Sequence, residues 1–193
     1  MLYHRNACEG ADDTLVELID YCYRKFSVMV GKCEALGDEE WLCPDVSMNA
    51  KETMKETKEQ EMDKQFEETE FKITMSCFSI IRFITDHIET LAVPIIHQLM
   101  ENNDIPCVLI PLLEEKPWFR LNAKGEEEKF EDQRWMKIEA NDRGKLTKIE
   151  AQIWLCIYNM FMTNDTSRKY EITSFRKQNL LRLRKYMNEV LLD

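Results

Sequence analysis

Histidine and cysteine are the residues of this sequence that could bind a metal ion or act as nucleophiles. The 193-residue chain has three histidines, at positions 4, 87 and 97, and seven cysteines, at positions 8, 22, 33, 43, 77, 107 and 156. A zinc site takes its Cys and His ligands as two close pairs, and the nearest approach here is His4 with Cys8. No second pair and no C-x-x-C motif occurs, so the sequence predicts no metal and no cofactor in this chain. The odd cysteine count and the apolar surroundings indicate reduced, buried thiols.

Motifs that would support catalysis are also missing. A phosphate-binding loop needs Ser or Thr after its Gly-Lys pair, whereas the two pairs here continue as Gly31-Lys32-Cys33 and Gly144-Lys145-Leu146. Asp86 beside His87 could form an oriented base, but the pair lies at the end of a predicted helix, where capping is the commoner role. A cysteine nucleophile with a distant histidine stays open as an alternative. We predict that the chain is not an enzyme and has no catalytic residue.

Four residues of one irregular segment could instead contact a protein partner. Trp118 and Trp135 flank an acidic run, and Arg120 and Arg134 lie beside them. Trp and Arg are enriched among the residues that dominate binding energy at protein interfaces. The alternative is that both rings fold back over the ends of neighbouring helices, which is the more frequent fate of large aromatic side chains.

The overall charge narrows the class of partner. A formal net charge of -10 repels nucleic-acid phosphates and anionic membrane surfaces, which favours a protein partner over nucleic acid. No stretch approaches the roughly 18 consecutive apolar residues of a membrane-spanning helix, and the first residues lack the apolar core of a signal peptide. The sequence therefore predicts a cytoplasmic protein without membrane insertion.

The elements that carry these residues are predicted to be helices. Only five glycines and five prolines occur, and apolar residues recur at helical spacing. Thr14 with Glu17 and Thr147 with Glu150 have the spacing of capping boxes, and the last helix is expected to begin near Thr173. The central helix should be buried through Phe66, Ile73, Cys77, Ile81, Ile84, Ile88 and Leu91, with Phe71, Met75, Phe78 and Phe83 on its flanks.

The remaining segments are expected to be short helices, a linker and a loop. Pro94 and Pro106 suit the first turns of two short apolar helices. The acidic half-helix 51–70 has few apolar anchors and should project into solvent. We expect a flexible acidic linker over 37–60 and a long loop over 116–145, with a weak hairpin near 130–138. Together these features predict one all-α domain over 1–193, a segment of an armadillo- or HEAT-like α-solenoid, although no strict internal repeat is visible.

Several blocks in matching order resemble the central part of the zinc finger MYND domain-containing protein 10 family of motile-cilium proteins. The blocks include Asp20-Tyr21-Cys22, 82–86, 105–109, Pro117-Trp118, Arg134-Trp135, Tyr158-Asn159 and Thr173-Ser174-Phe175. The resemblance implies an armadillo-like fold and a cytoplasmic assembly factor, which works with chaperones and other assembly factors on dynein chains as clients before dynein arms enter cilia. It also implies a location at centriolar satellites and the ciliary base.

The resemblance is incomplete at two places. The family's zinc-binding finger has no counterpart, because neither Cys nor His follows Cys156, so the chain is expected to be a fragment of the longer family architecture. The acidic segment 47–70 matches no family pattern. A general helical-repeat adaptor unrelated to cilia remains the alternative function.

Overall fold

Helices make up most of the structure, a computed structural model that describes residues 10–36, 57–122, 124–162 and 170–186. The helices are α1 (Asp12–Leu36), α3 (Lys58–Thr85), α4 (Val93–His97), α5 (Ile105–Glu115), α6 (Lys148–Met162) and α8 (Ser174–Arg182). Short helical turns are η2 (Ile88–Thr90), η3 (Gln98–Asn102), η4 (Ala140–Asp142) and η5 (Leu183–Tyr186). None of the described helices combines the length and apolar character needed to span a membrane.

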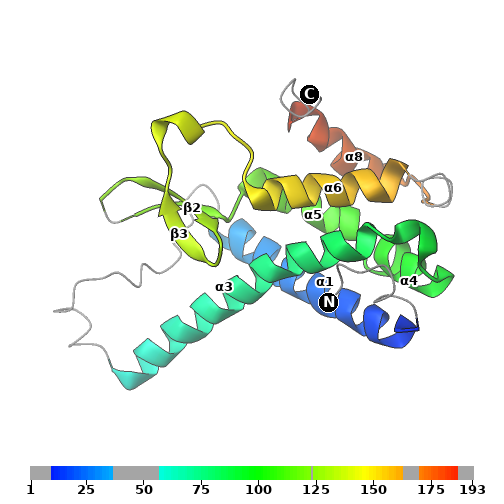
Figure 1. Ribbon diagram of the computed structural model, residues 1–193, viewed down its shortest axis with the longest axis horizontal. Helices are drawn as coiled ribbons and strands as arrows, with labels where there is room; N and C mark the ends of the chain where they lie inside the picture. Colours follow the sequence, from blue (N-terminus) through cyan, green and yellow to red (C-terminus); the bar gives the residue numbers. More distant parts are fainter. Residues whose placement is uncertain (1–9, 37–56, 123, 163–169, 187–193) are drawn as a thin grey trace.

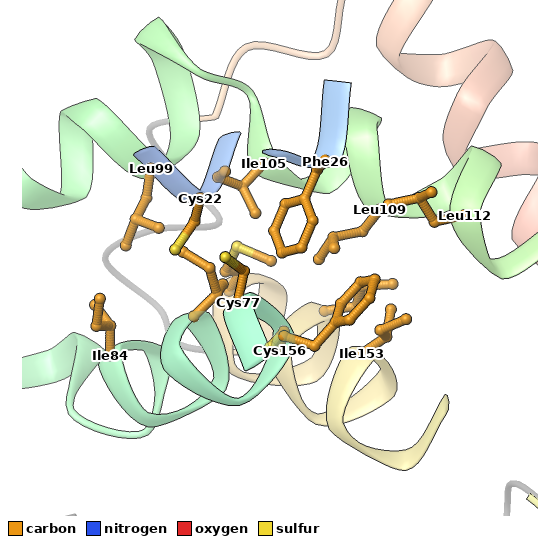
Figure 2. Close-up of a cluster of buried hydrophobic side chains, with 14 of the residues drawn as sticks. Cys22, Phe26, Cys77, Ile84, Leu99, Ile105, Leu109, Leu112, Ile153 and Cys156 are labelled. Atoms are coloured by element: carbon orange, nitrogen blue, oxygen red, sulfur yellow. The ribbon is translucent and has the colours of Figure 1, made fainter. Parts of the chain in front are cut away.

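The hydrophobic core lies where α3 crosses α1 and packs along α6, and α5 packs against both α1 and α6 (Figure 1). Figure 2 shows Cys22 of α1, Cys77 of α3 and Cys156 of α6 among the apolar side chains of this core. Phe26 stacks on Phe78 with ring centroids 4.7 Å apart. The prediction that the central helix is the most buried one is confirmed for its second half.

The first half of α3 extends away from the other helices (Figure 1), as its acidic composition predicts. The expected stripe is wrong at Phe66, whose side chain is 66% exposed. The core side chains here are Phe71, Met75 and Phe78, which the sequence placed on the flank. The ion pairs Lys32–Glu67 and Lys25–Glu70 join α1 to the part of α3 that follows Phe66.

Side-chain caps fix where several helices begin. Thr57 and Gln60 form a reciprocal capping box at α3, so the last three residues of the predicted linker 37–60 are helical, while 37–56 lie outside the described residues. At α8, the Thr173 side chain accepts a hydrogen bond from Arg176 N–H, as predicted. The box predicted at Thr14 is wrong, because α1 already begins at Asp12, where two aspartates complement the helix dipole.

The predicted capping box at α6 is confirmed, and it is buried. Thr147 N–H donates to Glu150 Oε2 (2.8 Å), and Glu150 N–H donates to Thr147 Oγ1 (3.2 Å). Lys116 Nζ lies 2.6 Å from the other carboxylate oxygen of Glu150. This box therefore joins the start of α6 to the end of α5.

We expect Thr147→Ala to lower the free energy of unfolding by about 1–2 kcal/mol, because the start of α6 loses its side-chain cap in a water-poor site. Urea denaturation followed by circular dichroism measures the change. Thr69→Ala is the matched control, since the Thr69 hydroxyl is exposed and bonds only to the Gln65 carbonyl of its own helix. An equal effect of the two substitutions would contradict a capping role for Thr147.

The two proline-containing helices follow the prediction. Pro94 and Pro106 lie in the first turns of α4 and α5, where a missing N–H costs no intrahelical hydrogen bond. Pro111 lies inside α5. The end of α5 is formed by Lys116 in the left-handed region, with φ 48°, so a residue other than glycine ends this helix.

The long loop expected over 116–145 instead contains a small three-stranded sheet, and the all-α prediction is wrong there. Strands β1 (Phe119–Leu121), β2 (Glu127–Glu131) and β3 (Arg134–Lys137) pair antiparallel in the order β1-β2-β3. The expected hairpin corresponds to β2 and β3, joined by Asp132 and Gln133, which both have positive φ. Strand β1 is additional. The sheet forms because Phe130 and Trp135 on one face pack against Phe71 of α3.

Helix α8 is attached to the body mainly by polar contacts. The Arg176 guanidinium donates to Asp104 Oδ2 (2.7 Å), to Glu101 Oε2 (3.1 Å) and to the Met100 carbonyl (3.3 Å). The Tyr170 hydroxyl donates to Asp104 Oδ1 at 2.6 Å, and the guanidinium lies 4.2 Å from the Tyr170 ring centroid. We call this set of residues the Arg176 clasp. Leu183, two helical turns after Arg176, is buried, as the sequence predicted for its helix face.

The α-solenoid arrangement stays a prediction. Stacked helices are present, but α1 and α3 cross each other, and a sheet interrupts the succession of helices between α5 and α6 (Figure 1). The described packing therefore establishes a mostly helical fold with a small sheet and does not establish an armadillo or HEAT repeat.

Candidate protein-interaction site

The structure places the four predicted partner-contact residues in or beside the sheet, but in different environments. Trp118 precedes β1 and is fully buried, with no exposed side-chain area. Its ring meets Phe78 edge-on, with centroids 5.7 Å apart, and its carbonyl accepts a hydrogen bond from Phe130 N–H. In this fold the Trp118 ring is not accessible to a partner. It packs against the helices, which is the alternative considered from the sequence.

Arg120 and Trp135 form a stack between the sheet and α3. The Arg120 guanidinium carbon lies 4.2 Å from the Trp135 ring centroid, and the opposite side of that ring stacks on Phe71 at 5.4 Å. Glu128 accepts from Arg120 at 2.8 Å, across the β1–β2 register that pairs these residues. Because the guanidinium is already satisfied and only 8% exposed, this stack anchors the sheet to the helices.

Arg134 lies on the opposite face of the sheet. Side chains of successive strand residues alternate between faces, so Trp135 and Lys137 point one way and Arg134 points the other. Its side chain is exposed at the first position of β3. The four residues are thus not one cluster, and Arg134 alone among them presents a charged group to solvent on the outer face.

The turn that carries Arg134 is held in place by contacts to two helices. Lys148 Nζ at the start of α6 donates to both Asp132 carboxylate oxygens, at 2.9 and 3.1 Å, and this hydrogen-bonded cation holds the pKa of Asp132 below its ordinary value. Gln133 Nε2 donates to Ser76 Oγ of α3 at 3.2 Å. The turn therefore presents Arg134 in a defined position.

Four of the five described cysteines have raised pKa values; the fifth, Cys77, has a pKa lowered by its hydrogen bond with Cys22 and is buried in the core. Burial raises the pKa of the Cys33 and Cys107 thiols to about 11 and that of Cys156 to about 12. A hydrogen bond to Cys77, together with burial, raises the pKa of Cys22. These four thiols are protonated at neutral pH, whereas a reactive cysteine needs thiolate. Cys8 and Cys43 lie outside the described residues.

The other chemically suggestive residues have structural roles or are not described. Asp86 ends α3, lies 2.8 Å from Arg82, and accepts a hydrogen bond from Asn159 of α6 at 3.1 Å. This matches the capping role expected at that position. In the part of the chain that the structure describes, no three His, Cys, Asp or Glu side chains could hold a metal ion. His4 and Cys8 fall outside that part.

A further surface, which the sequence interpretation missed, is the side of α6 that faces away from α3 and α5. Leu155, Tyr158 and Met162 are 43%, 60% and 66% exposed, and Ala151 shares their side of the helix. We call these four residues the α6 seam. The signal in the sequence is the run from Ala151 to Met162, which contains no charged residue, although a surface helix normally carries charges on its outer side.

Comparison with known proteins identifies a relative along the whole length of the chain. The chain is similar to Zinc finger MYND domain-containing protein 10 homolog from Drosophila melanogaster, with 29% identity over 192 residues that cover 100% of this chain. The aligned part is 40% of that relative's length, so the chain spans well under half of it. No family model and no solved structure matches the chain. The resemblance inferred from separate blocks is thus supported by an alignment along the whole chain.

Proposed function

We propose that this chain is a non-catalytic, protein-binding part of a cytoplasmic assembly factor for axonemal dynein arms. The observation that carries the proposal is the similarity to the Drosophila relative from one end of the chain to the other. Similarity along the whole length of the chain supports a shared role more strongly than one short motif does.

The proposed partners are chaperones, other dynein arm assembly factors and dynein chains as clients, with centriolar satellites and the ciliary base as further locations. Zinc belongs to the finger of the longer family architecture, and we propose no cofactor for this chain. Within the chain, the outer face of the sheet is the proposed contact region. Arg134 is its exposed charged group, and interface arginines often contribute much of the binding energy.

Affinity capture of the tagged chain from ciliated cells tests the proposed function. We expect recovery of dynein chains together with chaperones or assembly factors. Recovery of none of these proteins would count against the proposal. A general adaptor unrelated to cilia is the competing function, and expression confined to tissues without motile cilia would favour it.

We expect Arg134→Glu to reduce the recovery of direct partners by about tenfold, because a reversed charge at an interface repels the complementary group of the partner. Lys137→Glu is the matched control, since Lys137 is an exposed cation of the same strand on the other face of the sheet. Quantitative mass spectrometry of the captured proteins measures both. If both variants reduced the recovery of partners equally, Arg134 would not be part of the proposed contact.

A further inference from the structure

The α6 seam has the spacing of a helix that packs against another helix. Its four side chains recur at intervals of four, three and four residues, the alternation of four- and three-residue steps that the a and d positions of paired helices show. The inner side of the same helix is already used, because Ile149, Ile153, Cys156 and Met160 are buried against the body. Helix α6 is therefore apolar on two sides, and no described element covers the seam.

Among the residues that the structure describes, the borders of the seam contain no free charge. On one border lie Gln152 and Asn159, whose amides are hydrogen-bonded to Ser79 and Asp86 of α3. On the other border lie Trp154 and Phe161, which are partly buried against the core. The nearest charged side chains at its first end, Lys148 and Asp132, pair with each other.

Because the borders of the seam are uncharged, the surface that covers it should also be uncharged. A partner helix with charged residues beside its own apolar stripe would bury those charges against neutral groups, which costs free energy without compensation. A second α6 meets the requirement, because it is apolar and uncharged over the same twelve positions.

The sizes of the side chains favour an antiparallel pair. With α6 antiparallel to its copy, Ala151 lies opposite Met162 and Leu155 lies opposite Tyr158, so each contact joins a smaller side chain to a larger one. A parallel pair would place Ala151 against Ala151 and Tyr158 against Tyr158, which leaves a gap at one level and crowding at another. An antiparallel pair about a two-fold axis is also a closed arrangement, the commonest form of homodimer.

We propose that two copies of this chain associate through the α6 seam, with the two helices antiparallel. This inference is independent of the proposed assembly function. Four side chains per copy form a contact smaller than the ~800 Å² per partner of a standard interface. The association is therefore weak and depends on protein concentration.

Sedimentation velocity of the purified chain over a range of concentrations tests the proposal. We expect a concentration-dependent change from monomer to dimer, and we expect Leu155→Glu and Tyr158→Lys each to weaken it at least tenfold. Leu181→Glu is the matched control, because Leu181 of α8 is 58% exposed and lies outside the seam. Circular dichroism establishes that each variant is folded.

Mixing the two seam variants tests the antiparallel register. In an antiparallel pair Glu at position 155 of one copy meets Lys at position 158 of the other, so the mixture should form a heterodimer although neither variant dimerises alone. A parallel pair would give no such rescue. A chain that stays monomeric at all concentrations, a Leu155→Glu variant that still dimerises, or an unrescued mixture would overturn the proposal. The proposal would also be overturned if the chain were monomeric and the seam variants lost another protein in the affinity capture.

Discussion

Replacement of Arg176 by methionine is expected to lower the free energy of unfolding by about 2–4 kcal/mol, because it leaves the carboxylates of Asp104 and Glu101 without their common cation. The Arg176 side chain is 9% exposed, whereas the two carboxylates are 22% and 32% exposed, so solvent screening reduces the cost below that of a fully buried pair. Helix α8 should detach first, since these contacts join its first turn to residues 100–104, whereas the other ion pairs of this segment, to Glu114, come from the more exposed cations Arg182 and Lys185.

Urea denaturation measures the global change, and hydrogen exchange of the α8 amides measures the local one. Arg182→Met is the matched control: Arg182 is 46% exposed, and its partner Glu114 keeps a second cation in Lys185 at 2.9 Å. We expect less than about 0.5–1 kcal/mol for that control. Arg176→Lys should recover only part of the stability, because an ammonium group cannot reproduce the forked guanidinium contacts. A loss for Arg176→Met no larger than for Arg182→Met would show that the clasp does not hold α8.

The second large effect is expected at Trp118, where replacement by alanine should cost about 3–5 kcal/mol through the cavity it leaves beside Phe78. That is a large part of the stability of an ordinary domain, so Trp118→Ala is expected to be largely unfolded at moderate urea concentration. Trp118→Phe should cost much less. Nε1 of Trp118 is buried without a hydrogen-bond partner in the described part of the chain, and phenylalanine removes that unsatisfied donor while keeping most of the ring.

Trp154→Ala is the matched control for Trp118, since Trp154 is only partly buried at the edge of the core. Chemical denaturation of the three variants gives the comparison. If Trp118→Ala kept wild-type stability and lost a captured partner, the burial role would be wrong and the ring would have to be accessible in solution. A smaller loss for Trp118→Ala than for Trp154→Ala would likewise contradict it.

The sequence was most informative about contacts between near neighbours in the chain. Thr147 and Glu150 lie within one helical turn, so their spacing alone predicts the cap that the structure shows. The positions of Pro94 and Pro106 could also be predicted from the sequence, because the restricted φ and the missing N–H of proline act locally. Thr14 and Glu17 have the same spacing but do not cap a helix start, since α1 already begins before them, at Asp12 and Asp13.

The sheet and the Arg176 clasp could not be predicted from local sequence patterns. Strand β1 is three residues long and is stabilised by the Arg120–Glu128 contact and by packing on α3, neither of which is visible in a local window. The turn at Asp132 and Gln133 lacks the Asn-Gly or Asp-Gly signature of a tight hairpin. Arg176 and Asp104 are 72 residues apart, and nothing in the sequence near either one identifies the other as its partner.

For the candidate site, the sequence identified residue types better than their positions. Trp and Arg are interface residues on average, yet three of the four chosen here anchor the sheet or fill the core. The α6 seam had a readable signal, a helix of twelve positions without charge, but a run of apolar residues is also what a buried helix shows. Only the fractional exposure of Tyr158 and Met162 separates the two cases.

The long separation between Asp104 and its two partners has a consequence for synthesis on the ribosome. The residues of α1, α3, α4 and α5 leave the exit tunnel before Tyr170 and Arg176 do. Until then the side of α5 that α8 covers is open to water, and the Asp104 carboxylate has no cation. A product truncated before position 170 would keep that surface exposed, which is the property by which cellular quality control selects proteins for degradation.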